Sequence, residues 1–450
     1  MATFRAERDT GYRGIWYMNQ PVKSPLRYKY SGGFATYPQQ HVPIAIYAPK
    51  AQKTFFVYGA TPPGKNTLWH AVSYFDHKTG TVPRPALLLD KKTDDAHDNP
   101  TLAIDGDGYL WVFSNSHGTG RPSFIHRSVK PYEIDAWERI LETNFSYGQP
   151  WWLEKHGFVF LHTRYSKGRG LFCQTSRDGR TWDEPQPTAF IAQGHYQISW
   201  PDTKRGVLTT VFDYHPSPGG LNARTNLYLM QSRDGGKSWA SISGEKLTLP
   251  LTQTPNPALV FDYQKEGKLV YLKDVGYDAA GRVIVLYLTS KGFELGPQSG
   301  PYQWWTARWT GTGWERNAVT ESDHNYDHGS FYIEGEGQWR MMAPTGPGPQ
   351  PGTTGGEVFV WTTQNFGQSW RKEASLTPSA TRNHTYVRRP LDAHPGFYAL
   401  WADGDPLDDL KAPHFSQLYF ATKTGAVFTL PEAMPTETAS PTPYNYAKTS

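Results

Sequence analysis

One short string that ends in tryptophan occurs three times along this chain, as Ser176–Trp182, Ser232–Trp239 and Thr363–Trp370. Each copy follows a strand-like alternation of apolar and polar residues, places Asp or Asn two residues after Ser or Thr, and then supplies Gly. The polar side chains can bond the backbone of a hairpin turn, Gly accepts a positive φ, and the Trp ring can pack beneath the turn. The chain is therefore expected to repeat one β-hairpin unit.

The spacing of the copies sets the size of the repeated unit. Trp182 and Trp239 lie 57 residues apart, and Trp239 and Trp370 lie 131 residues apart, a little over twice as far. One four-stranded sheet in about 60 residues fits this period, so the chain has room for about seven sheets. The strings resemble the Asp-box, or BNR, repeat of β-propeller proteins, although the third copy has Asn in place of Asp. We predict an all-β, seven-bladed β-propeller.

The composition supports one sheet-rich domain. Aromatic residues make up 15% of the chain and charged residues 19%, with 43 Gly and 36 Pro, which fits many short strands and turns. Helical periodicity is nearly absent. We expect a single propeller domain over residues 1–430 and an irregular tail, rich in Pro, Thr and Ser, over residues 431–450. The N-terminal segment is expected to close the ring beside the last blade, because an open ring leaves strand edges unpaired.

The charge balance limits the classes of binding partner, and the cysteine count limits how the fold is held together. The formal net charge is +4 and no run of Lys and Arg occurs, which argues against nucleic acid and permits an acidic substrate. No apolar run approaches the roughly 20 residues of a membrane span, so no membrane partner is expected. Cys173 is the only cysteine, so burial and strand pairing must hold the fold without an intrachain disulfide. We expect a monomer.

The first residues, Met1–Arg8, contain no apolar signal segment. Taken literally this indicates a cytoplasmic protein, but a chain trimmed of its export signal would look the same. We expect a secreted or periplasmic protein.

Four groups of segments carry more polar and titratable residues than blade packing needs. They are residues 95–100 with 114–118, 147–150 with 163–165, 213–216 with 222–226, and 323–329. One strand separates His97 from His117, so the two histidines can flank one innermost strand or its neighbour. Because propellers bind ligands at the mouth of their central channel, we look for the chemistry there.

At these segments the chain resembles the β-propeller polysaccharide lyases that cut ulvan, and related enzymes that act on rhamnose–glucuronate linkages. The residues that carry the resemblance are Gly11–Tyr17, Tyr28–Gly33, Thr36–His41, Lys53–Gly59, His97–Pro100, His117–Gly118, Arg224–Tyr228 and Thr385–Arg389. The resemblance therefore covers nearly the whole chain. It implies a polysaccharide lyase that cleaves a uronate 4-linkage by β-elimination, with ulvan, a polymer of sulfated rhamnose and glucuronate or iduronate, as the expected substrate.

In that family a His and a Tyr act as the acid and base, and an Arg with another His neutralises the uronate carboxylate. The residues matched to these catalytic roles are His97, His117, Tyr147 and Arg164. The residues expected to bind substrate are Asn99, Tyr214, His215 and Arg224. Order and spacing, rather than a unique string, place Tyr147 and Arg164 in this set.

These residue types suit β-elimination. The C5 proton of a uronic acid is weakly acidic until the adjacent carboxylate is neutralised, which an Arg can do with a two-pronged hydrogen bond. A His is a competent base at neutral pH. A Tyr can donate a proton to the leaving O4, or act as the base if Arg164 lowers its pKa. The scheme requires no metal, although His324 and His328 could ligate a structural zinc or calcium ion if their loop curls.

Other interpretations remain open. His97 can cap a turn, Arg164 can belong to a structural ion pair, His215 can be structural, and His41 can belong to a second site on the opposite face, although a packed role is favoured. A sialidase-like hydrolase would need an arginine triad, and Arg13–Trp16 differs from the usual Arg-Ile-Pro opening. Further alternatives are an exo-acting rhamnose–glucuronate lyase, a glycoside hydrolase acting on arabinogalactan-type glycans, and a non-catalytic glycan-binding propeller.

Overall fold

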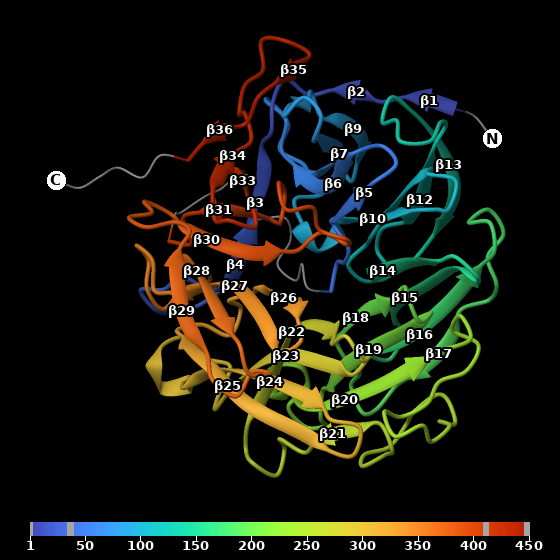
Figure 1. The fold of residues 1–450 in the computed structure, drawn as a ribbon, viewed down its shortest axis with the longest axis vertical. Coiled ribbons are helices and arrows are strands. Elements are labelled where there is room, and N and C mark those ends of the chain that lie inside the picture. The colour runs from blue at the N-terminus through green and yellow to red at the C-terminus, as the bar shows by residue number, and fades with distance from the viewer. Residues whose placement is uncertain (1–2, 34–39, 408–413, 445–450) are drawn as a thin grey trace.

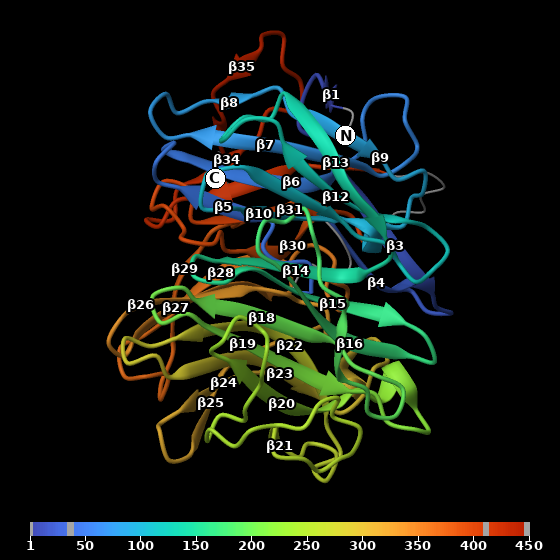
Figure 2. The same ribbon diagram turned by 90° about the vertical axis from the view of Figure 1, so that its right-hand side faces the viewer.

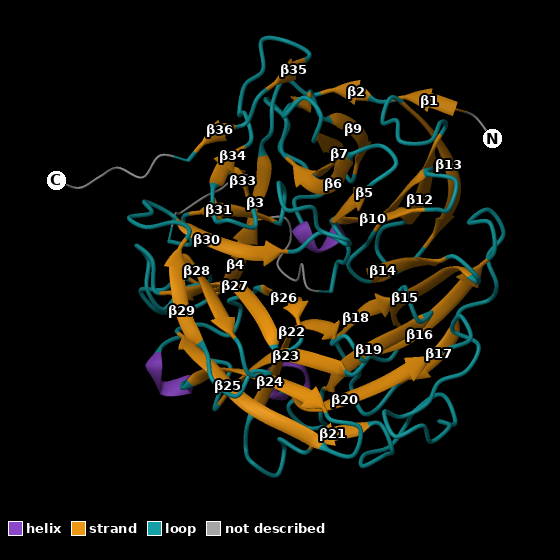
Figure 3. Ribbon diagram, viewed as in Figure 1, coloured by secondary structure: helices purple, strands orange, loops and turns teal. Residues whose placement is uncertain are grey.

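The computed structural model describes residues 3–33, 40–407 and 414–444. Within these ranges, antiparallel sheets of four or more strands are arranged in a ring, and a small two-stranded sheet lies beside them (Figure 1). The only helical elements described are three single turns, η1 (Ala96–Asp98), η2 (Gly220–Ala223) and η3 (Pro297–Ser299) (Figure 3). None of them is long or apolar enough to cross a membrane. The prediction of an all-β propeller is confirmed.

Four strands that are consecutive or nearly consecutive in the chain make the body of each large sheet. The first four sheets are built from β5 (Ala45–Ala48), β6 (Lys53–Ala60), β7 (Trp69–Asp76), β9 (Ala86–Asp90); β10 (Pro100–Ile104), β11 (Leu110–Ser114), β12 (Ser123–Ser128), β13 (Ala136–Thr143); β14 (Ser146–Leu153), β15 (Gly157–Tyr165), β16 (Arg169–Ser176), β17 (Gln186–Ala189); and β18 (Gln197–Asp202), β19 (Val207–Tyr214), β20 (Thr225–Ser232), β21 (Leu259–Phe261). The other three are built from β22 (Leu269–Tyr277), β23 (Val283–Ser290), β24 (Tyr302–Trp309), β25 (Trp314–Ser322); β26 (Ser330–Gly335), β27 (Gln338–Gly346), β28 (Glu357–Thr363), β29 (Arg371–Ser375); and β30 (Asn383–Arg388), β31 (Ala399–Gly404), β33 (Leu418–Ala421), β34 (Val427–Thr429).

The sheet that contains β6 joins the two ends of the chain. Besides its four-stranded body it includes β2 (Glu7–Arg8), β3 (Gly14–Pro21), β4 (Tyr28–Gly33) and β32 (His414–Ser416). β3 pairs antiparallel with β32, and β4 contacts β30 and β31. The N-terminal segment thus closes the ring beside the last sheet, as predicted, and it leaves no open edge between β3 and β32.

Short strands extend the outer edges of the propeller. β1 (Thr3–Arg5) pairs with β13, β35 (Thr438–Ala439) pairs with β8 (Val82–Pro83), and β36 (Thr442–Pro443) pairs with β34. The segment expected to be an irregular tail is therefore partly paired with the propeller. Its last residues, 445–450, lie outside the described residues, as do residues 36–39 of the N-terminal resemblance.

The three repeated strings form turns between the third and fourth strands of their sheets, after β16, β20 and β28. In the first copy Ser176 Oγ accepts a hydrogen bond from the Gly179 N–H at 2.8 Å, and the other copies make the matching bond. Trp239 is buried, whereas Trp182 and Trp370 are only partly buried. The strings are structural, as their sequence indicated, and they lie away from the channel.

The first strand of each sheet lies innermost. β10, β14, β18, β22 and β26 contact one another in order around the centre of the ring. Figure 2 shows the sheets stacked side by side along this ring. Residues that precede these strands meet at one mouth of the channel, and residues that follow them meet at the other. Both mouths therefore draw side chains from several sheets that are far apart in the sequence.

Candidate active site

One carboxylate holds the two histidines predicted to be catalytic. Asp95 caps η1, where it accepts a hydrogen bond from the backbone N–H of His97. Its Oδ1 also lies 2.6 Å from His97 Nδ1, and its Oδ2 lies 2.8 Å from His117 Nδ1. The two imidazole rings stack with their centroids 4.1 Å apart and their planes inclined by 21°. The structure thus brings His97 and His117 together, as predicted, through an aspartate that the sequence assignment left out.

The protonation of this group follows from its burial and hydrogen bonds. Burial alone would raise the pKa of Asp95, but the hydrogen bonds with His117 and His97 outweigh it and hold that pKa well below its usual range. Burial lowers the pKa of His97 even though Asp95 acts in the opposite direction. An ionised Asp95 accepts a hydrogen bond from the Nδ1–H of each ring, so Nε2 is the ring nitrogen that does not bind Asp95.

A second buried aspartate fixes the loop that carries His117. Asp98 Oδ1 accepts a hydrogen bond from the His117 N–H at 2.7 Å. Both oxygens of Asp98 also accept from Arg121, at 2.8 Å from Nε and 2.9 Å from Nη2, while Lys91 Nζ lies 3.5 Å away. Two cations therefore compensate this buried carboxylate, and its hydrogen bonds hold the loop in place.

The N-terminal hairpin forms one wall of the site. The rings of Tyr17 on β3 and Tyr30 on β4 stand edge-on to His97, with centroids 5.5 Å and 6.3 Å from it. Behind them, His41 Nε2 lies 2.9 Å from the backbone oxygen of His97, and the His41 ring is buried against Tyr147. His41 therefore belongs to this mouth, in a packed position, and not to a site on the opposite face.

Tyr147 lies beside the histidines at the start of β14. Its ring centroid is 6.4 Å from that of His97, and its hydroxyl lies 3.0 Å from the hydroxyl of Tyr165 on β15. Burial raises the pKa of Tyr147 well above its usual value, and burial raises that of Tyr165 to about 12. Both tyrosines are therefore protonated at neutral pH, which makes them proton donors.

The guanidinium beside these tyrosines belongs to Arg169. Arg169 is the cross-strand partner of Tyr165, so both side chains lie on one face of the sheet. Its Nε donates a hydrogen bond to the Tyr165 hydroxyl at 3.2 Å, and the ring of Tyr165 lies 6.0 Å from that of His117. A histidine, a tyrosine and an arginine thus share one partly open surface, on which 30% of the His117 side chain is exposed.

Arg164 does not join this group, contrary to prediction. Side chains alternate between the two faces of a strand, so Arg164 points away from the face that carries its neighbour Tyr165. Its Nε lies 3.3 Å from His162 Nε2, and its guanidinium lies over the ring of Phe172 at 5.8 Å. The order along the chain placed an arginine on the right hairpin but could not determine which one faces the histidines.

Arg224 and His215 extend the same mouth on the far side of Tyr196. The guanidinium of Arg224 is buried, donates to the Tyr326 hydroxyl at 2.9 Å, and lies over the rings of Tyr271 at 4.5 Å and Tyr196 at 5.0 Å. The ring of His215 is buried edge-on to Tyr196, at 5.1 Å, and burial lowers its pKa. Both side chains therefore support the aromatic floor of the site.

Two predicted substrate-binding residues lie elsewhere. Asn99 is buried beneath the loop, so close to Gly59 that a Cβ atom there would lie 2.1 Å from Asn99 Oδ1. Tyr214 is buried in the apolar core of its sheet, where its hydroxyl donates to Gln264 Oε1 at 2.9 Å. Neither side chain faces the open surface, because burial fixes Asn99 and strand alternation turns Tyr214 away from the channel.

The two histidines of the 323–329 segment have different partners: His324 Nδ1 accepts a hydrogen bond from the Tyr326 N–H at 3.1 Å, and His328 contacts a lysine. His328 Nδ1 lies 2.8 Å from Lys273 Nζ, and burial lowers the pKa of Lys273 well below its usual value. Within the described ranges, the only group of three side chains with metal-ligand spacing is Asp95, His97 and His117, whose ligand atoms lie within 4.8 Å of one another. A cation at that position would have to replace the two ring protons that now bind Asp95.

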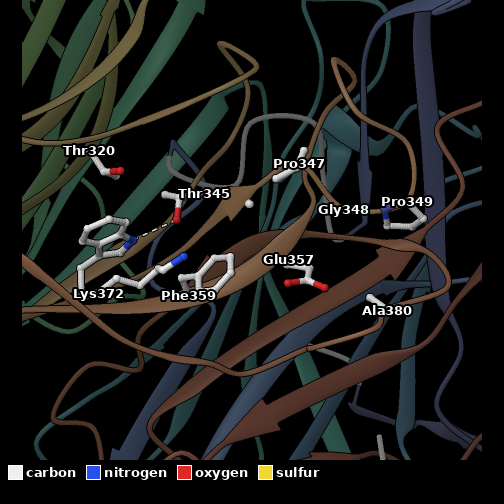
Figure 4. Close-up of a pocket in the computed structure, with 11 residues that line it drawn as sticks. Thr320, Thr345, Pro347, Gly348, Pro349, Glu357, Phe359, Lys372 and Ala380 are labelled. Atoms are coloured by element: carbon white, nitrogen blue, oxygen red, sulfur yellow. Dashed lines mark hydrogen bonds between the residues drawn. The ribbon is translucent and has the colours of Figure 1, made fainter. Parts of the chain in front are cut away.

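A separate cavity of about 560 Å³ lies beside β28 and β29 (Figure 4). Trp361 donates a hydrogen bond to Thr345 Oγ1 at 2.9 Å there, and Lys372 lies over the ring of Phe359. The described residues that line this cavity include neither His nor Arg. Its titratable lining groups are one carboxylate, Glu357, and one lysine, Lys372, whereas the channel mouth brings histidines, tyrosines and an arginine together, so the histidine mouth is the candidate active site.

Residues 57–322, more than half of the chain, match the BNR repeat-containing family, and the chain belongs to that family. Over 327 residues it is 25% identical to an ulvan lyase of Nonlabens ulvanivorans, an alignment that covers 63% of this chain and 65% of the relative. The chain thus spans just under two thirds of that relative's length.

Solved structures show the same fold. An ulvan lyase of the polysaccharide lyase family PL25 is similar with a TM-score of 0.70 and 17% identity, over 96% of this chain and all of the other. A structure of that lyase bound to -[GlcA(1-4)Rha3S]- is similar with a TM-score of 0.69 and 17% identity, over 97% of this chain and all of the other.

Proposed function

We propose that this protein is a polysaccharide lyase that cleaves a uronate 4-linkage by β-elimination. The observation that carries the proposal is the surface formed by His117, Tyr165 and Arg169, with His117 oriented by Asp95. These groups supply a base, an acid and a cation for a carboxylate within one channel mouth. A retaining or inverting glycosidase would instead need two carboxyl groups facing the scissile bond, and Asp95 is occupied by both histidines.

In the proposed reaction, Arg169 binds the uronate carboxylate and stabilises negative charge as the C5 proton leaves. His117 Nε2 takes that proton, because Nδ1 is held by Asp95 and its side chain is more exposed than that of His97. The C5–H electrons form the C4–C5 double bond, and the C4–O4 bond breaks. Tyr165 donates its proton to O4 and is linked to Tyr147 by the contact between their hydroxyls. His97 and Tyr147 act as positioning residues in this scheme.

We propose ulvan as the substrate. The curated relative named above is an ulvan lyase, and one similar structure holds a glucuronate-(1-4)-rhamnose-3-sulfate segment. The mouth of the channel in this chain carries the arginine and histidine groups that a glucuronate would need. The experiment must distinguish this function from three alternatives. They are an exo-acting lyase on another rhamnose–glucuronate polymer, a hydrolase on arabinogalactan-type glycans and a non-catalytic glycan binder.

We propose that the ring has seven blades. Seven sheets of the described chain each contain a four-stranded meander, including β5, β6, β7 and β9. The ring has six blades if the sheet that joins the two ends of the chain is treated only as the closure of the ring and not as a blade. A crystal structure in which that meander packs between the β10 and β30 sheets as an equal member supports seven, and one in which it lies outside the ring overturns it.

The remaining proposals concern the state of the protein. We propose a secreted or periplasmic monomer with one propeller domain and no catalytic metal, although zinc or calcium could have a structural role. Dialysis against a chelator should leave turnover unchanged and tests the requirement for metal. Light scattering coupled to size-exclusion chromatography tests the monomer.

The direct test is a panel of uronate polysaccharides followed by two assays. A lyase releases new reducing ends together with the ultraviolet absorbance of an unsaturated uronate. A hydrolase releases reducing ends without that absorbance, and a glycan binder releases neither. Ulvan is expected to give both signals.

The variants Tyr165→Phe and Tyr147→Phe connect the activity to the site. Tyr165→Phe deletes the proposed proton donor and should lower kcat by about 10²-fold or more while oligosaccharide still binds. Tyr147→Phe should have a smaller effect, because it removes only the hydroxyl that contacts Tyr165. Tyr214→Phe is the matched control, since its hydroxyl contacts Gln264 within the sheet core. Parental turnover in Tyr165→Phe would exclude this tyrosine as the acid.

A further inference from the structure

A second cavity, of about 640 Å³, lies at the other mouth of the channel. Most of its lining residues lie at or just after the ends of the innermost strands, whereas the candidate active site precedes these strands. β14 carries both ends, with Tyr147 near its start and Trp152 near its finish. Five residue steps along a strand span about 16 Å, so the two sites are separated by the depth of the channel.

Unpaired cations surround this cavity. Lys50 lies in the turn after β5, Lys155 in the turn after β14, Lys204 in the turn after β18, and Arg233 in the turn after β20. All four are exposed, and none lies within 4.0 Å of a carboxylate oxygen of a described residue. Turns from three sheets therefore direct positive charge to one hollow.

The acidic residues of the cavity offset only part of this charge. Five lysines and arginines line it against three aspartates and glutamates. Of the acids, Asp105 is already engaged, because its Oδ2 accepts a hydrogen bond from Trp111 Nε1 at 2.8 Å and its Oδ1 accepts from its own turn. Arg205, the fifth cation, is paired with Asp202. The remaining groups give the cavity an excess of positive charge.

Trp152 supplies a flat apolar surface in the same cavity. It is partly exposed and stands edge-on to Phe158, with ring centroids 4.9 Å apart. The indole N–H of Trp152 has no hydrogen-bond acceptor among the described residues, and this N–H is not fully buried. A Cβ atom on the facing Gly106 would lie 3.3 Å from Trp152 Nε1, so this glycine leaves room beside the indole. A partly exposed indole with a free donor suits a sugar ring that carries acceptor oxygens.

We propose that this cavity is a second, non-catalytic binding site for an anionic polysaccharide. Sulfate or carboxylate groups of the polymer bind Lys50, Lys155 and Lys204, and one pyranose ring packs on Trp152. A cavity of this size holds a few sugar rings and is too small for a nucleic-acid duplex. The class of ligand rests on the proposed function, while the location rests on the charge and shape of the cavity alone.

The test is affinity electrophoresis in gels that contain ulvan, with a neutral polysaccharide gel as reference. The double variant Lys50→Glu/Lys155→Glu reverses two exposed cations, and the matched control Lys246→Glu reverses an exposed lysine outside the cavity. We expect the double variant to bind ulvan about tenfold more weakly or worse, and Lys246→Glu to bind like the parent. Trp152→Ala should also weaken binding, and thermal unfolding of each variant shows that it is folded.

Two further measurements show whether the cavity binds the polymer itself or only a single anion. Inorganic sulfate at the concentration of the polymer's sulfate groups should not displace ulvan, because a single ion lacks the sugar contact with Trp152. Turnover of a short oligosaccharide should be unchanged in the double variant, while KM for the polymer rises. A folded double variant that binds and cleaves polymeric ulvan like the parent overturns the inference.

The outcomes also distinguish this inference from the proposed function. If the parent cleaves no polysaccharide but the double variant loses retention, the second site stands and the lyase assignment fails. If the parent is a lyase and retention is unaffected by the double variant, the lyase assignment stands and the second site fails.

Discussion

The two mouths of the channel are built on the same strands but in different ways. At the mouth that precedes the strands, His97, Tyr147 and Arg224 are almost fully buried, and hydrogen bonds or ring contacts fix each of them. At the mouth that follows the strands, Lys50 and Lys155 are exposed and have no carboxylate partner among the described residues.

This difference separates two physical tasks. Acid–base chemistry requires groups held in fixed geometry, with their protons placed by neighbours such as Asp95. Attraction of a charged polymer requires only uncompensated charge that stays hydrated and long-ranged. We therefore expect substitutions at the first mouth to change turnover, and substitutions at the second mouth to change binding of the polymer.

The largest expected effect is that of Arg169→Ala. Loss of the guanidinium beside Tyr165 removes the group that neutralises the carboxylate as charge develops, so kcat should fall by about 10²- to 10³-fold. KM should change less than kcat, because the interaction strengthens in the transition state. Arg164→Ala is the matched control and should keep nearly parental kinetics. If Arg164→Ala is the more damaging variant, the assignment of the two arginines is reversed.

Asp95→Asn should lower kcat by about 10²-fold, because one amide oxygen cannot accept the Nδ1 protons of both histidines. Asp105→Asn makes the same change at the other mouth and should leave turnover of a short oligosaccharide near the parental value. Steady-state kinetics of the two variants give the comparison directly. Equal losses in both would show that the two mouths are not functionally distinct.

Acid should destabilise the fold through buried histidines near the first mouth. Burial lowers the pKa of His195 to about 4, and its Nδ1 and Nε2 bond to Asp213 O and Ile191 N. The unfolded chain, with a His pKa of about 6.5, binds a proton that the native state excludes. Stability is therefore present at neutral pH and lost as pH falls from 6.5 towards 4, by about 2 kcal/mol between pH 7 and pH 5 for this histidine.

Urea unfolding at pH 7 and pH 5 measures that loss. His195→Gln removes the titrating group, so the variant should lose less stability than the parent over the same interval. An identical loss in parent and variant would show that His195 is protonated in the native state or does not contribute to the pH dependence.

The smallest expected effect is that of salt. Raising ionic strength from about 0.05 M to 0.5 M shortens the Debye length several-fold and should weaken retention on ulvan by several-fold through the exposed lysines. Turnover of a short oligosaccharide at saturation should change little, because the buried groups of the first mouth are screened less. Affinity electrophoresis and steady-state rates at matched salt test this. A fall in kcat as large as the fall in retention would contradict the proposed division of tasks.

Much of the fold could be predicted from local patterns. The spacing of Trp182 and Trp239 gave the size of the repeated sheet, and the turns at these strings bond as their residues indicated. The separation of His97 and His117 by one strand was enough to predict that they meet. Asp95 could have been found from its position two residues before His97, which suits a cap that also binds the ring.

The sequence by itself determined that this chain forms repeated antiparallel sheets and that polar residues cluster before the innermost strands. Only the tertiary structure decided that Arg169 faces Tyr165 while Arg164 faces Phe172, because strand pairing sets which side chains share a face. It also decided that exposed lysines from separate sheets surround one cavity. Repeats depend on short-range patterns that a sequence displays, whereas convergence of distant turns depends on closure of the ring.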